Sequence, residues 1–379
     1  MKKIRTAIIG PGKVAHLHAG ALQNCRNTEF VAICGRTASK TEAFAAQYRI
    51  KAYSDLEEMI RQEQVEALIV CTPHPNHRDP VILAAQMGVH CLIEKPMAST
   101  LQDCDDMLGA ARANGVTLGV VSQRRFYEPV RRMKEAIDQG KIGQPALGHV
   151  VVLGWRDEAY YRSDPWRGQW ETEGGGILVN QAPHQLDLFQ WLMGPIDQVY
   201  GLARNLNHPY IEVEDTAVAV VQFKSGAVGN LVLSNSQKPG IYGKIHVHGS
   251  NGASVGAQTE GGAMFIAGQT SVQEPPVTDL WTIPGEEHLP ERWKQQDTEL
   301  FNRIDAAGYY IGLQVNDFAE ALAEGREPLV TGEEGRRTVE LFTAVYRSNR
   351  DNAPVKFPLQ PENGTDMDGR KTKTGERAK

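Results

Sequence analysis

Lys95 is the residue of this chain that is best placed to do chemistry. It follows a strand-like apolar run, Val89 to Ile93, within the tripeptide Glu94-Lys95-Pro96. Open α/β sheets hold ligands at the carboxyl ends of their parallel strands, and a lysine there can exchange a proton with a substrate. The proline restricts the backbone before it, and the Lys95-Pro96 bond is a candidate for the cis form. The alternative is a solvent-facing lysine at a strand end.

A second group of polar residues lies in an apolar segment that opens with three glycines at 174–176. Asn180, His184 and Asp187 are four and three residues apart, so a continuous helix would place them on one face. Polar groups there cost free energy unless they meet a partner or a ligand. Histidine also titrates near neutral pH, which suits proton transfer to a hydroxyl or carbonyl. The pattern predicts catalytic residues; a histidine that bonds a neighbouring loop is the alternative.

The segment just upstream, residues 160–170, mixes aromatic rings with hydrogen-bonding groups. Rings can stack on the C–H faces of a sugar, whose hydroxyls need hydrogen-bond partners. We therefore select Tyr161, Trp166 and Arg167 as candidate substrate-binding residues.

The elements that must position these residues begin with a glycine-rich turn. Gly10-Pro11-Gly12-Lys13-Val14-Ala15 follows an apolar run and opens a helical pattern. In the dinucleotide fingerprint the first glycine allows the tight turn, the second lets the backbone approach a pyrophosphate, and the small third residue packs helix on strand. The helix N-terminus adds N–H donors. We predict a dinucleotide site at Gly10, Gly12, Lys13 and Val14; a turn without a ligand is the alternative.

The end of the second strand indicates which dinucleotide binds. An acidic residue about 20 residues after the glycines holds the ribose of NAD, whereas an arginine suits the phosphate of NADP. Gly35 and Arg36 stand there, residues 31–40 contain no carboxylate, and Lys40 is a further donor. The sequence therefore favours NAD(P) with a modest preference for NADP. Alternatively, Arg36 stacks on the adenine of either cofactor.

The loop at residues 71–77 is rich in proline and histidine and follows the fourth strand. Such a loop suits the wall of a cofactor pocket. The candidates for that wall are Thr72, Pro73, His77, Glu94 and Lys95. A zinc pair at His74 and His77 is the alternative, but no further ligands cluster nearby in the sequence, so no metal is expected.

The order of the elements indicates the fold class. From residue 4 to residue 121, short β-branched runs alternate with helical patterns, which predicts a doubly wound parallel sheet. Later, strand-like segments follow one another, as in an open, mainly antiparallel sheet. We expect an α/β protein with a Rossmann domain over 1–123, a substrate-binding α/β domain over 124–358, and a polar, disordered tail over 359–379.

Composition excludes several classes of function. The 379 residues suffice for two domains, and 41% hydrophobic and 23% charged residues are ordinary for a globular protein. The net charge of −6 gives no reason to expect a nucleic acid or an anionic membrane as partner. No signal peptide or membrane-spanning run is visible, and five cysteines without zinc-ligand spacing indicate reduced thiols. We expect a cytoplasmic protein.

These motifs resemble the Gfo/Idh/MocA oxidoreductases, which include glucose-fructose oxidoreductase and inositol dehydrogenases. The matching residues are the glycine turn, Thr72-Pro73 with His77, Glu94-Lys95-Pro96, Arg125-Phe126, and segments 174–194 and 311–349. The resemblance implies hydride transfer at a sugar or cyclitol carbinol and a second domain whose sheet forms a homodimer or homotetramer. It also implies that Lys95 and His184 flank the reacting oxygen and that Arg125 binds substrate.

One position departs from the family pattern. An aspartate commonly stands four residues before the helix histidine, but this chain has Asn180, which can orient a hydroxyl and cannot take a proton. Lys95 is then the better candidate for the base, and Asp187 is a candidate for orienting His184.

The predicted function is an NAD(P)-dependent dehydrogenase that acts on a secondary hydroxyl or ketone of a sugar, sugar derivative or cyclitol, with Asn180 and His184 also binding the substrate. Two alternatives stay open. One is a cofactor-recycling epimerase, eliminase, glycoside-cleaving enzyme or sugar–sugar oxidoreductase of the same family. The other is a non-catalytic protein that senses dinucleotides.

Overall fold

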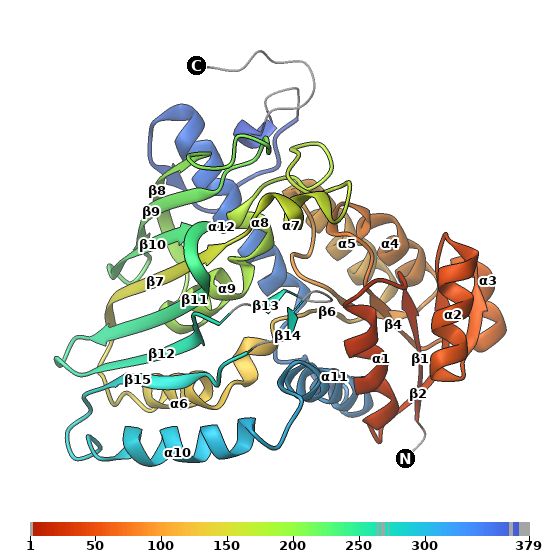
Figure 1. The fold of residues 1–379 in the computed structure, drawn as a ribbon, viewed down its shortest axis with the longest axis horizontal. Helices are drawn as coiled ribbons and strands as arrows, with labels where there is room; N and C mark the ends of the chain where they lie inside the picture. Colours follow the sequence, from red (N-terminus) through yellow and green to blue (C-terminus); the bar gives the residue numbers. More distant parts are fainter. Residues whose placement is uncertain (1–2, 264, 267–269, 272, 364–366, 371–379) are drawn as a thin grey trace. The chain divides into compact units, whose positions relative to one another are not determined.

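The computed structural model describes residues 3–263, 265–266, 270–271, 273–363 and 367–370. The chain divides into two compact units, which can be followed in Figure 1. The first contains the residues up to Gln123 and Asp305–Arg337, and the second contains Arg124–Ile304 and the residues from Thr338 on. The sequence-based division assigns residues 305–337 to the second domain, whereas the structure groups them with the first.

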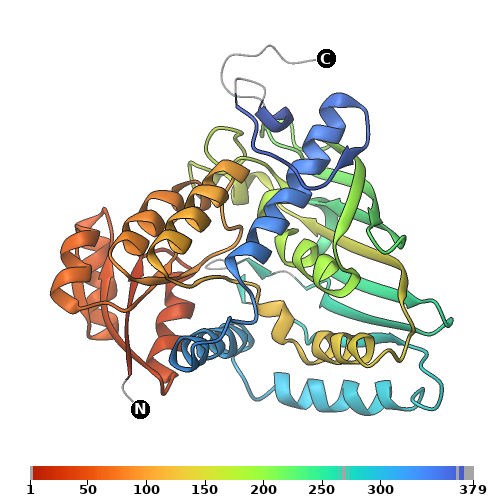
Figure 2. The same ribbon diagram turned by 180° about the vertical axis from the view of Figure 1, so that it is seen from behind.

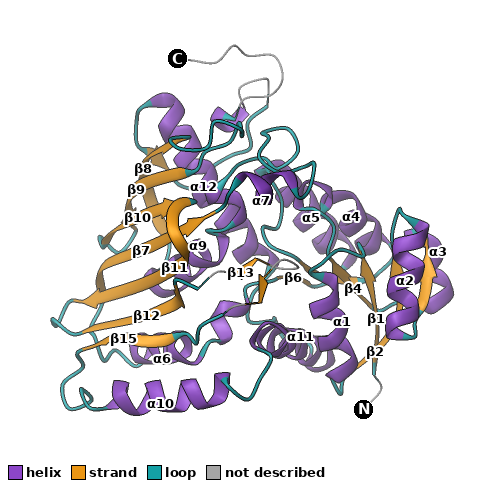
Figure 3. Cartoon of the chain, in the orientation of Figure 1, coloured by secondary structure: helices purple, strands orange, loops and turns teal. Residues whose placement is uncertain are grey.

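The first unit is built on six parallel strands in the order β3-β2-β1-β4-β5-β6. The strands are β1 (Ile4–Ile9), β2 (Thr28–Cys34), β3 (Lys51–Tyr53), β4 (Ala67–Val70), β5 (His90–Ile93) and β6 (Leu118–Val120). The helices are α1 (Ala15–Asn24), α2 (Ala38–Tyr48), α3 (Leu56–Glu63), α4 (Arg78–Gln86), α5 (Leu101–Asn114) and α11 (Ala306–Glu324). Figure 3 shows the predicted alternation of strand and helix. The predicted Rossmann sheet is confirmed, and its strand order reverses between β1 and β4, where such sheets bind ligands.

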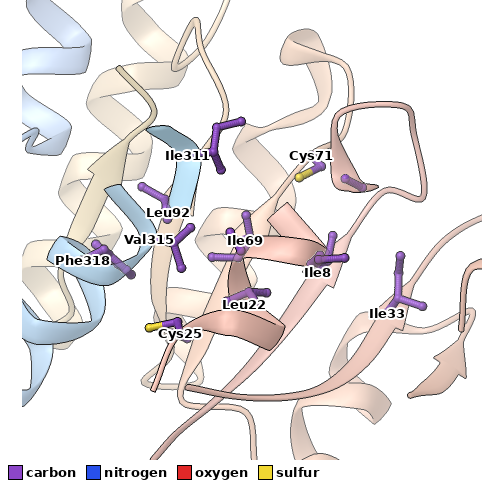
Figure 4. Close-up of a cluster of buried hydrophobic side chains, with 14 of the residues drawn as sticks. Ile8, Leu22, Cys25, Ile33, Ile69, Cys71, Leu92, Ile311, Val315 and Phe318 are labelled. Carbon is purple, nitrogen blue, oxygen red and sulfur yellow. The ribbon is translucent and has the colours of Figure 1, made fainter. Parts of the chain in front are cut away.

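The core of the first unit explains why α11 belongs to it. A buried cluster joins α1 and the sheet to this helix, as Figure 4 shows. The side chains that α11 contributes include Ile311, Val315 and Phe318. Gln314 on the same helix accepts the N–H of Ser122 at 2.9 Å and donates to the carbonyl oxygen of Val120 at 2.8 Å. The helix therefore covers apolar surface and also satisfies backbone groups at the end of β6.

The second unit is built on eight strands in the order β15-β12-β11-β7-β10-β9-β8-β16. Only β7 and β10 are parallel neighbours in this sheet, so the predicted mainly antiparallel sheet is confirmed. The strands are β7 (Pro145–Trp155), β8 (Ile196–Arg204), β9 (Thr216–Phe223), β10 (Val228–Ser234), β11 (Ser236–Gly249), β12 (Ser254–Gly261), β15 (Val277–Trp281) and β16 (Val355–Lys356). A hairpin of β13 (Phe265–Ile266) and β14 (Thr270–Ser271) is separate. The helices are α6 (Glu128–Asp138), α7 (Glu158–Arg162), α8 (Ile177–Asn180), α9 (Pro183–Met193), α10 (Leu289–Phe301) and α12 (Gly332–Asp351).

Helices α9 and α12 cover one face of this sheet, as Figure 2 shows from behind. Glycines on the strands let α9 approach closely. A Cβ at Gly229 on β10 would lie 2.6 Å from the ring of Phe189, and one at Gly148 on β7 would lie 2.7 Å from the sulfur of Met193. The helix that carries His184 is therefore seated directly on the sheet.

The opposite face of the sheet exposes apolar side chains on β8, β9 and β10. They are Tyr200, Leu202, Val218, Val220, Val228 and Val232. An exposed apolar group of this kind is typical of a surface that contacts another protein. Among the helices that the structure describes, none has the length and hydropathy needed to cross a membrane.

Part of the tail that the sequence predicts to be disordered is held against α12. Leu359 is only 3% exposed, and its N–H donates to a carboxylate oxygen of Glu340 at 2.6 Å. Farther on, Asp368 accepts from Nε of Arg347 at 2.8 Å. The predicted disorder is therefore not found in residues 359–363 and 367–370. Specific hydrogen bonds to α12 hold this segment, although it has no apolar face. Residues 364–366 and 371–379 of the predicted tail lie outside the described residues.

Candidate active site

The glycine turn after β1 is shaped by the loop after β4. Gly10 has a φ of 96°, and a Cβ there would lie 2.8 Å from backbone atoms of Cys71 and Thr72. At Gly12, which is exposed, the nearest atom to a Cβ would be 3.9 Å away. Val14 follows as the N-cap of α1. The turn thus provides an open stretch of backbone at a helix N-terminus, which fits the pyrophosphate of a dinucleotide.

Gly35, just after β2, is fixed by local packing. A Cβ at this position would lie 2.5 Å from Oγ1 of Thr41 and 2.6 Å from Cδ of Pro11, which belongs to the glycine turn. Packing therefore explains the missing side chain, whichever cofactor binds. The predicted cofactor residues with exposed side chains are Lys13, Arg36 and Lys40. The cationic groups near the end of β2 are compatible with a 2′-phosphate.

His77 joins the loops that follow β4 and β5. Its ring is fully buried, with Nε2 2.8 Å from the carbonyl oxygen of Thr72 and Nδ1 3.1 Å from that of Met97. Burial lowers the pKa of His77. The ring holds two loops together, while Thr72 and Pro73 in the same loop are half-buried and retain some exposed surface. No group of three or more His, Cys, Asp and Glu side chains within the described residues is arranged to hold a metal ion.

Glu94 and Lys95 open the loop after β5, and the Lys95-Pro96 bond is cis. The Lys95 side chain is half-buried. One oxygen of the buried Glu94 lies 2.7 Å from Nε2 of His18 on α1, and the other accepts the N–H of Lys95 at 3.1 Å. Burial alone would raise the pKa of Glu94, but His18 and the charge of Lys95 outweigh burial and lower it. A carboxylate is therefore fixed beside the candidate base.

The polar positions after the three glycines lie on two helices. Helix α8 ends at Asn180 and α9 begins at Pro183. The prediction of one continuous helix is wrong, because proline has no N–H to donate and its ring clashes with the preceding turn. Asn180 is therefore at the end of one helix, whereas His184 and Asp187 lie on the next, 6% and 5% exposed.

Arg125 and Asp187 are partners of each other. Nη2 and Nε of Arg125 donate to the two carboxylate oxygens at 2.6 and 2.8 Å, and the guanidinium lies 4.9 Å from the ring centroid of Trp191. Both side chains are nearly inaccessible to solvent. The bidentate pair fixes α9 to the segment that opens the second unit. The sequence predicts instead that Arg125 binds substrate and that Asp187 orients His184.

The aromatic segment is organised around Tyr160. The guanidinium of Arg167 lies 4.4 Å from the Tyr160 ring centroid and donates to its hydroxyl at 2.5 Å. It also lies 4.5 Å from the ring of Trp166. Tyr161 is buried, and its hydroxyl accepts from Asn235 at 3.4 Å. Of the predicted substrate-binding residues in this segment, Trp166 and Arg167 therefore keep the more accessible surface.

Asn180 is held by a carboxylate that the sequence does not single out. Its Nδ2 donates to Oε1 of Glu173, and the N–H of Gly168 donates to Oε2 at 2.5 Å. Glu173 is 1% exposed, and burial raises its pKa to about 7. Glu173 and His18 are both absent from the predicted site, because neither stands in a motif or a periodic pattern. Only the three-dimensional contacts identify them.

Family comparisons agree with this architecture. Residues 4–122 match "Oxidoreductase family, NAD-binding Rossmann fold", and residues 130–255 match "GFO/IDH/MocA C-terminal domain". The chain belongs to the Gfo/Idh/MocA oxidoreductases. The resemblance carried by its motifs is thereby confirmed, and the first unit is the NAD-binding domain of the family.

The names of individual relatives refer to different small molecules. The WlbA dehydrogenase from Bordetella pertussis, in a crystal structure with NADH and UDP-GlcNAcA, is 31% identical in sequence to this chain. The match has a TM-score of 0.83 and covers 95% of this chain and 99% of that one. Myo-inositol 2-dehydrogenase from Thermotoga maritima is 28% identical over 93% of this chain and 98% of that protein. The 2,7-anhydro-N-acetylneuraminate hydratase from Mediterraneibacter gnavus is 32% identical over 51% of this chain and 50% of that protein.

Proposed function

We propose that this protein is an NAD(P)-dependent oxidoreductase that transfers a hydride between the nicotinamide and a secondary hydroxyl or ketone of a sugar, sugar derivative or cyclitol. The observation that carries the proposal is Lys95, which follows β5 at the ligand-binding edge of a sheet whose glycine turn fits a dinucleotide. A bound nicotinamide supplies the acceptor or donor of the hydride. The inositol and the nucleotide sugar named for two relatives support a polyol or sugar substrate.

We assign proton transfer to Lys95. In the oxidation direction its neutral amine removes the hydroxyl proton, and in the reduction direction its ammonium returns one. His184 and Asn180 contact the same substrate in this proposal, and the loop residues Trp166 and Arg167 bind its remainder. The buried pair of Arg125 and Asp187 serves to hold α9. Family membership supports these roles, and so do the side-chain contacts that each residue makes within its own unit.

Replacing Lys95 with methionine tests the proposal, because the variant keeps most of the side-chain length and removes the amine. We expect kcat/KM to fall by about 10²- to 10⁴-fold, the usual value of a general acid or base, with NAD(P) binding retained. Sugars, inositols and nucleotide sugars are screened through the absorbance of reduced nicotinamide. Lys51→Met, which changes an exposed lysine on β3, is the matched control and should not alter turnover. Activity of Lys95→Met within about tenfold of wild type would refute the assignment.

A second function is favoured by the relative that is named a hydratase, since hydration involves no net oxidation. In that case a bound nicotinamide would supply hydride storage that is recycled within one turnover, and this chain would be an epimerase, an eliminase, a glycoside-cleaving enzyme or a sugar–sugar oxidoreductase. Purified protein would then carry its cofactor through gel filtration and convert substrate without a net change in nicotinamide absorbance. Bound cofactor without conversion of any substrate would indicate a dinucleotide sensor.

We further propose that NADP binds at least as tightly as NAD. Support comes from Arg36 and Lys40, both exposed near the end of β2, and from the absence of a carboxylate there. Gly35 lends no support, because its neighbours leave no room for a side chain. The WlbA dehydrogenase holds NADH, so titration of both cofactors into this protein is the deciding measurement.

Assembly and location complete the proposal. The exposed apolar side chains on β8, β9 and β10 support a homodimer or homotetramer formed through that face of the sheet. Light scattering coupled to size-exclusion chromatography measures its mass. The five cysteines are free thiols, which supports a cytoplasmic location.

A further inference from the structure

The contact between Asn180 and Glu173 fixes the direction of the asparagine amide. Nδ2 of Asn180 donates to Oε1 of Glu173, and it also lies 3.5 Å from the hydroxyl of Tyr160. The NH₂ donor and the carbonyl acceptor of an amide lie in one plane and point to opposite sides of the bond that carries them. A bond that holds Nδ2 therefore also decides where Oδ1 points.

The backbone beneath Asn180 is anchored independently. Glu214 accepts the N–H groups of Gly176 and Leu178 at 2.9 and 3.0 Å and so satisfies the first turn of α8. With the helix fixed in this way, the freedom left to Asn180 is the rotation of its side chain. The bond to Glu173 restricts this rotation.

We propose that Glu173 positions Asn180 by holding its Nδ2, which presents Oδ1 as the acceptor for a substrate hydroxyl. This inference rests on the proposed function, because it concerns how the same substrate is bound. An ionised carboxylate suits this position since it only accepts, and so satisfies both Asn180 and the N–H of Gly168. A glutamine would turn its own NH₂ group toward one of these two donors.

The contact depends on the charge of Glu173. Burial raises the pKa of Glu173 to about 7, so the group gains a proton close to neutral pH. The added hydrogen competes with Nδ2 of Asn180 and weakens the hold on the amide. The titratable groups that face Glu173 are Tyr160, Tyr161, Arg167, Glu214 and Tyr346. Burial raises the pKa of Glu214 and of each tyrosine, and Glu214 is bonded to the α8 backbone and to Tyr346.

A double-mutant cycle tests the proposal with the full-length wild type, Glu173→Gln, Asn180→Ala and the double variant. Kinetics are measured with NAD(P) and the best substrate from the screen. We expect Glu173→Gln to lower kcat/KM by about ten- to hundredfold, the effect of one charged hydrogen bond. In the Asn180→Ala background the same change should have no further effect. Glu171→Gln, which alters an exposed carboxylate two residues earlier, is the control and should leave kcat/KM unchanged.

A second measurement needs no change at Glu173. In the reduction direction the acting form of Lys95 is its ammonium, which acid does not remove. In that direction we expect kcat/KM of the wild type to fall as the pH drops through about 7, and in Asn180→Ala we expect this acidic limb to be absent. Equal losses for Glu173→Gln in both backgrounds, no loss in either, or an acidic limb retained by Asn180→Ala would overturn the inference and leave the proposed function intact. A wild-type protein that converts no substrate with NAD(P) would overturn both.

Discussion

Replacing Asp187 with asparagine should destabilise the second unit strongly, because it leaves Arg125 as a buried cation without its bidentate acceptor. The two side chains are only 2% and 7% exposed, and their N–O distance is 2.6 Å. Breaking a buried ion pair by removing one partner costs about 3–5 kcal/mol. In a unit of roughly 220 residues this corresponds to a fall in melting temperature of about 6–20 °C.

Urea unfolding, monitored by far-ultraviolet circular dichroism, measures this cost as a shift of the unfolding midpoint with an unchanged slope of free energy against urea concentration. Glu158→Gln is the matched control, since Glu158 pairs with Arg162 on α7 where the side chains are 46% and 76% exposed. An exposed pair contributes about 0–1 kcal/mol, so the control should unfold almost as the wild type does.

A double variant separates the burial of charge from the packing of the site. Arg125→Met with Asp187→Leu removes both charges and keeps apolar volume beside Trp191, so we expect it to recover most of the stability that either single change loses. A cost below about 1 kcal/mol for Asp187→Asn would refute the reasoning, since that is the value of a solvated pair. The reasoning would also be refuted if the double variant lost as much unfolding free energy as the two single variants together.

Three further predictions concern stability and cofactor choice. Gly35→Ala should lower stability by about 1–3 kcal/mol through overpacking, because its Cβ would lie 2.5 Å from Thr41 and 2.6 Å from Pro11; an unchanged melting temperature would contradict this. Arg36→Ala should weaken NADP by about 1.5–3 kcal/mol and NAD by only a few-fold in calorimetric titrations, whereas equal losses would mean that Arg36 stacks on adenine. Burial by itself would raise the pKa of Asp215, but hydrogen bonds from a buried histidine and from backbone N–H groups outweigh burial, so the pKa lies below the ordinary 3.8. Such a carboxylate stabilises the fold at pH values above its pKa in the unfolded chain, and this stabilisation is lost as the pH falls through its pKa in the folded protein. The urea midpoints of wild type and Asp215→Asn should therefore converge on acidification. A constant difference between the two midpoints at every pH would count against this.

The Rossmann unit could be predicted because its signals are local. The glycine turn, the alternation of strand with helix and Lys95 after β5 each occupy a short stretch of sequence. Strands that alternate with helices are joined in parallel by right-handed crossovers. The return of α11 to this unit could not be predicted in the same way. Its amphipathic pattern indicates that it packs on something, and only the complete fold shows which surface it covers.

The candidate site in the second unit is less accessible to sequence reasoning. The break before Pro183 is readable, because proline at a helix start is a common signal, but the i, i+4, i+7 spacing suggests a continuous helix. The bond from Arg125 to Asp187 spans 62 residues, and no local sequence pattern identifies the two residues as partners. Glu173 is close to Asn180 in the chain, yet its burial follows from the surrounding loop and not from any periodicity.

The placement of α11 has a consequence for how the chain is made. A ribosome that has finished Gln123 must add roughly 180 more residues before it reaches Ala306, which takes on the order of 10 to 40 s at ordinary elongation rates. During that interval the nascent Rossmann segment exposes the apolar patch that α11 later covers. The segment 124–304 of the second unit emerges meanwhile, so completion of the first unit depends on a part of the polypeptide that is made late. A chain released early at Ile304 should therefore be a substrate for chaperones and proteases, even though it contains every predicted cofactor residue.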